Sequence, residues 1–232
     1  MNKIKKLLNY FSRTEKIVLF SSLTLIIVSF LLFDRENYLT LIASLLGAVS
    51  LIFNAKGNPF GQVLIIIFAF IYGYISYGFG YYGEMLTYLG MSAPMATFSL
   101  IAWLRNPYKG KRSEVTIATL KAIDVIIGII FAIVVTIIFY FILAYFNTAN
   151  LIVSTLSVTT SFFAAYFLFR RSPYFALAYA VNDIVLIILW VLASIEDMSY
   201  ISVVICFASF LLNDMYSFIN WIRMRKRQNE GL

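Results

Sequence analysis

Eight long apolar stretches occupy most of this chain, and they limit its fold more than any other feature. They cover about residues 16–33, 38–54, 60–80, 84–104, 119–146, 151–169, 174–195 and 198–222. Each is close to the roughly 20 residues that an α-helix needs to cross a hydrocarbon core about 30 Å thick. Only 12% of the 232 residues are charged, against about 25% in soluble domains. The sequence therefore predicts an all-α integral membrane protein with eight transmembrane helices.

The basic residues are distributed unevenly between the two ends of these helices. If the N-terminus is cytoplasmic, Arg35 is the only one of the 18 lysines and arginines that falls outside the inner segments. Cytoplasmic loops carry such an excess, so we expect a multi-pass protein with both termini in the cytoplasm. The net charge of +7 then reflects topology, and no nucleic-acid partner is expected.

The first apolar stretch is expected to be a retained helix. The basic residues before it resemble those of a signal peptide. Its apolar run is too long for the apolar region of a signal peptide, however, and "LLFDRENY" lacks a small-x-small cleavage site. Ser12 and Glu15 have the spacing of a capping box, which predicts the helix start. Residues 1–37 are therefore interpreted as a basic cytoplasmic N-terminus with an extra transmembrane helix.

Two parts of the chain resemble each other when Pro59 is aligned with Pro173. Small residues stand twelve and sixteen positions before each proline, and Trp-x-Arg follows at the end of each part, at Trp103 and Trp221. The small residues are Gly47, Ala43, Ser161 and Ser157. This pattern predicts a transporter core, residues 38–224, made of two parallel three-helix repeats.

The repeats cover residues 38–106 and 150–224, and a single linker helix at 119–146 gives them the same orientation in a 1+3+1+3 arrangement. Residues 225–232 would form a basic cytoplasmic tail. Repeats of this kind are typical of small-solute transporters, whose substrate site lies near mid-membrane between the repeats.

An Asn-Asp pair occurs in each of the last two apolar stretches, at Asn182-Asp183 and Asn213-Asp214. Both pairs lie roughly 12–13 Å from the inner boundary at a rise of 1.5 Å per residue. An ionisable residue at that depth costs about 2.5–3.5 kcal/mol and usually faces the bundle interior or a watery cavity. The pairs either bond neighbouring helices or bind substrate, and an amide beside a carboxylate suits a vicinal diol such as a ribose.

Other polar and aromatic residues are candidates for the same site. Tyr216 and Asn220 continue the helix face that begins at Asn213, and Trp190 is either a pocket wall or part of the lipid belt. Near the outer mouth, the candidates are Tyr77, in a stripe with Tyr74 and Tyr81, followed by Glu84 and Tyr88.

Three residues have expected structural or gating roles. Pro94 lies near mid-depth of its helix, where a proline frees a carbonyl and kinks the helix, so it is either a gating hinge or a packing feature. Trp103 and Trp221 each stand beside basic residues at the inner boundary. They are expected to be interface anchors.

The sequence contains no histidine, which excludes Ser-His-Asp triads, histidine metal sites and histidine proton relays. It shows no nucleophile–base pair, metal cluster or phosphate-binding loop, so neither an enzyme nor a cofactor is expected. Membrane-embedded catalysis and a binding protein without transport remain alternatives. Proton coupling is another, since Asp183 or Asp214 could titrate.

Several longer stretches resemble the PnuC family of bacterial nicotinamide riboside transporters. They are "YYGEMLTYLGMSAPM", "AWLRNP", "RRSPYFALAYAVNDIVLIILW" and "FLLNDMYSFINW". They occur in the family's order, and the resemblance covers about residues 38–224.

The resemblance implies a 3+1+3 helix core related in shape to SWEET sugar transporters, with one extra N-terminal helix. It also implies uptake of nicotinamide riboside, a precursor for NAD biosynthesis, by facilitated diffusion across the bacterial cytoplasmic membrane. Phosphorylation inside the cell would trap the riboside, and the protein would be a homotrimer. Another vitamin, thiamine first and then riboflavin, is the main alternative substrate.

Overall fold

The computed structural model describes residues 10–78 and 82–231. Eight spans in this part of the chain are long and apolar enough to cross a membrane, which confirms the expected number. They are α2 (Arg13–Phe33), α3 (Tyr38–Ala55), α4 (Phe60–Gly78), a broken span from Tyr82 to Arg105, α7 (Ala122–Tyr145), α8 (Leu151–Phe169), α9 (Tyr174–Ser194) and a span that ends with α10 (Ile201–Asn229).

The broken span consists of α5 (Tyr82–Leu86), the π-helix η1 (Thr87–Ser92) and α6 (Ala93–Arg105). Pro94 is the second residue of α6. A proline is tolerated in the first turn of a helix, because the missing N–H has no partner there anyway. Pro94 therefore stands where the π turn passes into α6, and the backbone at Ser92 and Ala93 stays helical there. Its role as a gating hinge stays a prediction.

The structure also contains a hairpin that an all-α expectation leaves out. Strands β1 (Pro107–Tyr108) and β2 (Lys111–Val115) pair antiparallel. Lys109 and Gly110 between them both have positive φ, 47° and 75°, which suits the two-residue turns of hairpins.

The last span departs from expectation as well. It opens with the 3₁₀ turn η2 (Met198–Tyr200), and α10 continues to Asn229 instead of ending near residue 222.

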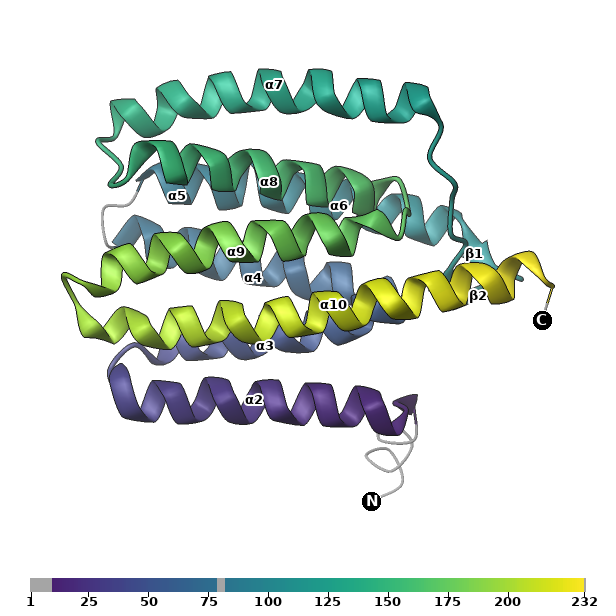
Figure 1. Ribbon diagram of the computed structural model, residues 1–232, viewed down its shortest axis with the longest axis horizontal. Coiled ribbons are helices and arrows are strands. Elements are labelled where there is room, and N and C mark those ends of the chain that lie inside the picture. Colours follow the sequence, from purple (N-terminus) through teal and green to yellow (C-terminus); the bar gives the residue numbers. More distant parts are fainter. Residues whose placement is uncertain (1–9, 79–81, 232) are drawn as a thin grey trace.

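Six helices form a closed ring in the order α3, α4, α6, α8, α9 and α10, because each contacts the next and α10 contacts α3. Helix α2 packs outside this ring against α3 and α10, and α7 packs outside it against α8. Figure 1 shows α2 and α7 at opposite edges of the molecule. The start of α2 and the end of α10 lie at the same end, together with the hairpin.

The first unit (α3, α4 and α5–α6) and the second unit (α8, α9 and α10) end their first helices in the same way. Gly57 follows α3 with φ +63°, and Arg171 follows α8 with φ +56°. Each makes the paired backbone bonds of a Schellman motif, such as Asn58 N–H to Phe53 O and Ser172 N–H to Phe167 O, both 3.0 Å. Pro59 and Pro173 come two residues later.

The flanking helices are attached to the two units by corresponding ion pairs. Glu15, in the first turn of α2, accepts from Lys56 at the end of α3 at 3.0 Å. Asp124, in the first turn of α7, pairs with Arg170 at the end of α8. Glu15 also completes the capping box that its spacing from Ser12 predicts. These matched contacts favour the inferred repeat, and they give α2 and α7 corresponding places in it.

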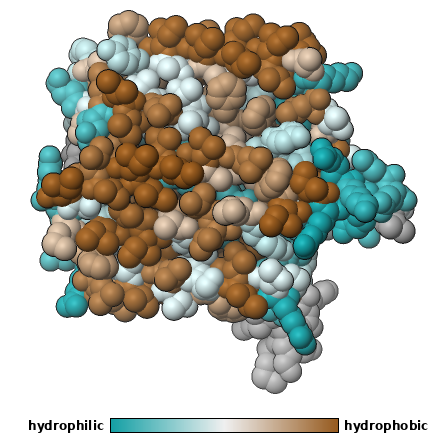
Figure 2. Space-filling model, in the orientation of Figure 1, coloured by the Kyte–Doolittle hydropathy of each residue, from teal (hydrophilic) through white to brown (hydrophobic). Residues whose placement is uncertain are grey.

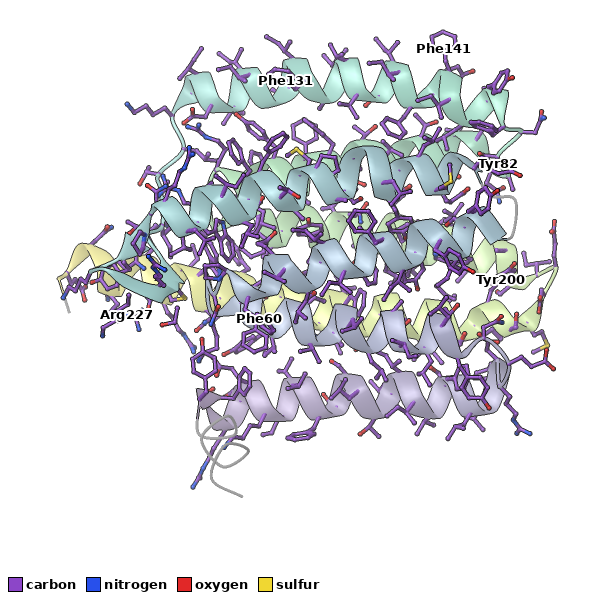
Figure 3. The ribbon with its side chains drawn as sticks, turned by 180° about the vertical axis from the view of Figure 1, so that it is seen from behind. Phe60, Tyr82, Phe131, Phe141, Tyr200 and Arg227 are labelled. Carbon is purple, nitrogen blue, oxygen red and sulfur yellow. The ribbon has the colours of Figure 1, made fainter. Side chains whose placement is uncertain are left out.

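The outside of the bundle is apolar over most of its length. Figure 2 shows a hydrophobic surface across the helices and a hydrophilic one at the end that carries the hairpin. On α7, Phe131 and Phe141 project away from the bundle (Figure 3), with 56% and 66% of their surface exposed. Such a surface matches lipid, and every span is a helix that satisfies its own backbone. The chain is therefore a multi-pass membrane protein.

Gly47 on α3 allows close packing between the units. A Cβ atom there would lie 2.7 Å from the ring of Phe210 on α10. We expect Gly47→Ala to lower the free energy of unfolding by about 1–3 kcal/mol, because the buried ring must move. Gly90→Ala is the matched control, since its Cβ would meet nothing within 4 Å and alanine favours helix. Denaturant unfolding in detergent measures both, and equal stabilities would contradict the packing argument.

Candidate functional site

The two aspartates of the Asn-Asp pairs meet between α9 and α10. Asp183 and Asp214 are buried, with 3% and 2% of their surface exposed, and their side chains hydrogen-bond to each other. The expectation that antiparallel helices bring both pairs to one depth is confirmed. Asp183 Oδ2 and Asp214 Oδ1 have no hydrogen-bond partner. We call these two residues the acid pair.

The ion pairs among the described residues lie away from the acid pair. They are Lys56–Glu15, Arg170–Asp124, Lys226–Glu230 and Arg227–Glu114. Within that part of the chain, no lysine or arginine neutralises Asp183 or Asp214. An unpaired buried carboxylate is unfavourable, so the acid pair is suited to a cationic ligand.

Aromatic side chains border the acid pair. Tyr179 stands one turn before Asp183 on α9 and interacts electrostatically with both carboxyls. Across the ring of helices, Tyr72 on α4 and Tyr88 in η1 have ring centroids 5.1 Å apart. Cys206 on α10 interacts electrostatically with both of these tyrosines and with Asp183. The tyrosine rings and the acid pair therefore border one region.

The two asparagines face in different directions. The Asn182 side-chain oxygen accepts from the Thr160 hydroxyl on α8 at 2.8 Å. The Asn213 amide donates to Ser22 on the flanking helix α2 at 2.7 Å and to the carbonyl of Ser209. Asn213 therefore joins α10 to α2, which matches the structural interpretation of an Asn-Asp pair. Its side-chain oxygen has no partner.

The structure does not gather the remaining candidates around the acid pair. The Trp190 ring is two turns from Asp183 and meets Tyr200 at 5.2 Å. The Tyr216 hydroxyl donates to Glu15 at 3.3 Å, and the Asn220 amide donates to the Ala55 carbonyl at 2.8 Å, both toward the end of the bundle that carries the hairpin.

The outer-mouth candidates also lie in different environments. Tyr77 is 61% exposed and Tyr74 is 70% exposed, so this stripe faces outward, while Tyr81 lies outside the described residues. Glu84 is half-buried in α5, at the end of the bundle away from the hairpin. Of the outer-mouth candidates, Tyr88 is the one that borders the region of the acid pair.

A small polar cavity lies between the two units, next to Tyr179. Its volume is about 30 Å³, enough for one or two water molecules. Gln62 Oε1 and Ser99 Oγ have no hydrogen-bond partner, and both side chains are almost fully buried. The polar lining residues are Gln62, Ser92, Ser99, Ser161 and Tyr179. Drug-sized ligands occupy pockets of about 300–1,000 Å³, so a nucleoside can enter only after the helices separate.

Two tryptophans close the end of the bundle that carries the hairpin. Trp103 and Trp221 are fully buried, with ring centroids 5.5 Å apart, so the prediction that they anchor the interface is wrong. The Trp103 indole donates to Leu168 O of the second unit at 3.1 Å, and the Trp221 indole donates to Asn54 O of the first at 2.8 Å. Val115 of the hairpin packs beneath them. The hairpin, which the sequence did not reveal, covers the rings.

Sequence reasoning missed Gln62, Tyr72, Tyr179 and Cys206. Tyr179 could have been found from the sequence, because residues four apart lie on one face of a helix and Asp183 follows Tyr179 by four residues. Gln62 is an amide near the start of a strongly apolar helix. Tyr72 had no such signal, since it is one of 16 tyrosines and several of the others are exposed. Cys206 is the one cysteine of the chain, and its apolar surroundings in the sequence give no sign of a polar neighbour.

Comparison with known proteins agrees with this architecture. Residues 37–223 match the family model described as nicotinamide mononucleotide transporter. A nicotinamide riboside transporter PnuC of Neisseria mucosa is 24% identical over 201 residues, covering 85% of this chain and 76% of the relative. That of Haemophilus influenzae is 24% identical over 197 residues, covering 84% and 83%.

A solved structure has the same fold. The crystal structure of the vitamin B3 transporter PnuC superposes with a TM-score of 0.79 at 22% identity and covers 94% of each chain. At that identity the likeness establishes the fold alone. The family match spans both units and the flanking helix α7, and the chain therefore belongs to the nicotinamide mononucleotide transporter family.

Proposed function

We propose that this protein carries nicotinamide riboside across the bacterial cytoplasmic membrane. The observation that carries the proposal is the acid pair, which is buried among membrane-spanning helices and bordered by tyrosine rings. Nicotinamide riboside has a cationic pyridinium ring, a carboxamide and ribose hydroxyls. A cation over an aromatic face gains about 0.5–2 kcal/mol, and a buried carboxylate supplies the opposite charge. The relatives' names agree with this substrate.

The charge of the site favours the riboside over its phosphorylated form. None of the described residues that line the acid pair or the adjoining cavity is a lysine or arginine. Phosphate groups bind at arginine, lysine or helix N-termini, and a phosphate dianion would be repelled by the carboxylates. The same repulsion supports trapping, because riboside phosphorylated inside the cell could not return.

In the proposed mechanism, the pyridinium ring lies between the acid pair and Tyr72 and Tyr88. Asn182, which directly precedes Asp183 on α9, is proposed to bind ribose hydroxyls once Thr160 on α8 releases it. Transport is facilitated diffusion, in which the site opens alternately to each side. The positive-inside pattern supports cytoplasmic termini. A homotrimer, as the family resemblance implies, would cover part of the exposed apolar surface.

Equilibrium binding to the purified protein tests this function. Nicotinamide riboside is expected to bind, and the mononucleotide and the uncharged riboflavin are expected to bind at least tenfold more weakly. Thiamine is the informative competitor, because it too is an aromatic cation. If thiamine binds and the riboside does not, the cation site stands and the proposed substrate is wrong. Uptake into sealed vesicles distinguishes a transporter from a protein that only binds.

A further inference from the structure

Two buried polar atoms at the cavity between the two units have no partner in the described part of the chain. Gln62 on α4 and Ser99 on α6 both line this cavity, whose volume is about 30 Å³. These residues are 0% and 1% exposed, yet Gln62 Oε1 and Ser99 Oγ make no hydrogen bond to any described residue. Buried polar groups are normally hydrogen-bonded. Two unpaired atoms at one cavity therefore point to a ligand that supplies the missing bonds.

The hydrogen bonds around these two side chains leave their free atoms available to a ligand. The Gln62 amide nitrogen donates to Asn54 Oδ1 on α3 at 2.8 Å, so the oxygen is the free end of the Gln62 amide. A serine or threonine inside a helix often bonds a carbonyl one turn earlier, as the Thr97 hydroxyl of α6 does with Ala93 O at 2.8 Å. Ser99 on the same helix makes no such bond. Gln62 therefore offers an oriented acceptor, and Ser99 offers a hydroxyl that its own helix does not use.

The cavity is polar but uncharged, which limits the group that it can bind. None of the described residues that line it is a lysine, arginine, aspartate or glutamate. A cationic ring or a phosphate would lie there without an opposite charge, which is unfavourable in a buried site. A neutral group with a donor and an acceptor would pair with both free atoms. The cavity has space for about one or two water molecules, so it suits one small polar group of a larger ligand.

The cavity adjoins the proposed site for the cationic ring. Tyr179 lines the cavity and stands one turn before Asp183 on the same face of α9. Ser161 of α8 also lines the cavity, and the residue before it, Thr160, donates to Asn182 at 2.8 Å. A ligand whose ring lies at the acid pair can therefore extend a neighbouring polar group into this cavity.

We propose that Gln62 and Ser99 bind the carboxamide of nicotinamide riboside and select the ligand by it. Gln62 Oε1 accepts from the carboxamide N–H, and Ser99 Oγ donates to the carboxamide oxygen. The carboxamide and the ribose are attached to different atoms of the pyridinium ring, so the ribose can lie at Asn182 at the same time. A site built to bond a polar group rejects analogues without it, because its own buried groups then stay unpaired. This inference rests on the proposed function.

Three ribosides with the same positive charge test the assignment by calorimetric binding to the purified full-length protein. They are nicotinamide riboside, 3-acetylpyridine riboside, in which a methyl group replaces the amide nitrogen, and pyridine riboside, which has no substituent at that ring position. The acetyl riboside should bind at least about tenfold more weakly than nicotinamide riboside, because a methyl group leaves Gln62 Oε1 unpaired. In Gln62→Met these two ribosides should bind equally.

Ser99→Ala tests the second contact. Nicotinamide riboside should bind about tenfold more weakly to this variant, because its carbonyl loses a donor, while pyridine riboside should bind as before. The variant deletes a hydroxyl that has no partner in the described chain, so its free energy of unfolding should not fall. Thr97→Val is the control, since it removes a hydroxyl from the exposed side of the same helix, and it should change the affinity of neither riboside.

The outcomes separate this inference from the proposed function. Loss of discrimination against the acetyl riboside in Gln62→Met, with a loss in Ser99→Ala that needs the ligand's carbonyl, supports the proposal. If the original chain binds the acetyl and nicotinamide ribosides equally, or if Ser99→Ala weakens pyridine riboside just as much, the cavity does not bind the carboxamide and the cation site is unaffected. If Gln62→Met does not fold, the Ser99→Ala comparison decides alone. If none of the three ribosides binds the original chain, the proposed function fails and this inference fails with it.

Discussion

Replacing both members of the acid pair, Asp183→Asn with Asp214→Asn, should weaken nicotinamide riboside binding by at least about 30-fold. Loss of one side of a buried charge pair costs about 2–5 kcal/mol or more, and this double variant removes both possible carboxylates. Asparagine keeps the shape of each side chain, so packing between α9 and α10 is conserved. Equilibrium binding to the purified variant measures the loss.

Two controls accompany this prediction. Asp197→Asn is the matched substitution at an exposed acid between α9 and α10, and riboside affinity should not change there. Each single replacement leaves one carboxyl able to ionise, so its loss should be smaller than that of the double variant. A folded double variant that binds the riboside as tightly as the original chain would exclude the acid pair as the cation site.

Removing the ring of Trp221 should produce the largest loss of stability. Trp221→Ala deletes a fully buried indole from the cluster with Trp103 and Phe175. It also removes the indole bond to the Asn54 carbonyl, which keeps its backbone bond from the Gly57 N–H at 2.9 Å. Large-to-small changes of this kind cost about 3–5 kcal/mol. Denaturant unfolding in detergent, followed by a probe other than tryptophan fluorescence, measures the change.

Further variants separate the ring from its hydrogen bond. Trp221→Phe keeps an aromatic ring in the cluster and removes the N–H, so it should lose less stability than Trp221→Ala. Trp103→Ala removes the corresponding bond to Leu168 and should resemble Trp221→Ala. A Trp221→Ala protein as stable as the original would show that the two tryptophans contribute little to the stability of the fold.

The sequence predicted the spans, the capped start of α2 and the shared depth of Asp183 and Asp214. These depend on apolar length, local capping and helical rise, which are local properties of a sequence. The partners of the two aspartates could not be predicted in the same way. Tyr72 comes from another unit, and its position depends on how α4 is rotated within the ring.

The tryptophans show a second limit of sequence reasoning. Their places beside basic residues favoured the interface, but the chain after Arg105 folds back as a hairpin and inserts Val115 beneath them. A two-stranded hairpin is marginally stable alone. Backbone bonds from Val115 to Gly57 and from Ala118 to Arg171 hold this segment in place. Such long-range contacts leave no periodicity in the sequence.

The crossed hydrogen bonds of Trp103 and Trp221 determine how the hairpin end of the bundle can open. Each bond joins the last helix of one unit to the first helix of the other, so the two bonds cross the interface between the units in opposite directions. Moving the units apart at this end therefore breaks both bonds and uncovers both rings in one step. Packed interfaces of this kind switch between discrete arrangements, so a half-open state that would leak small ions is disfavoured.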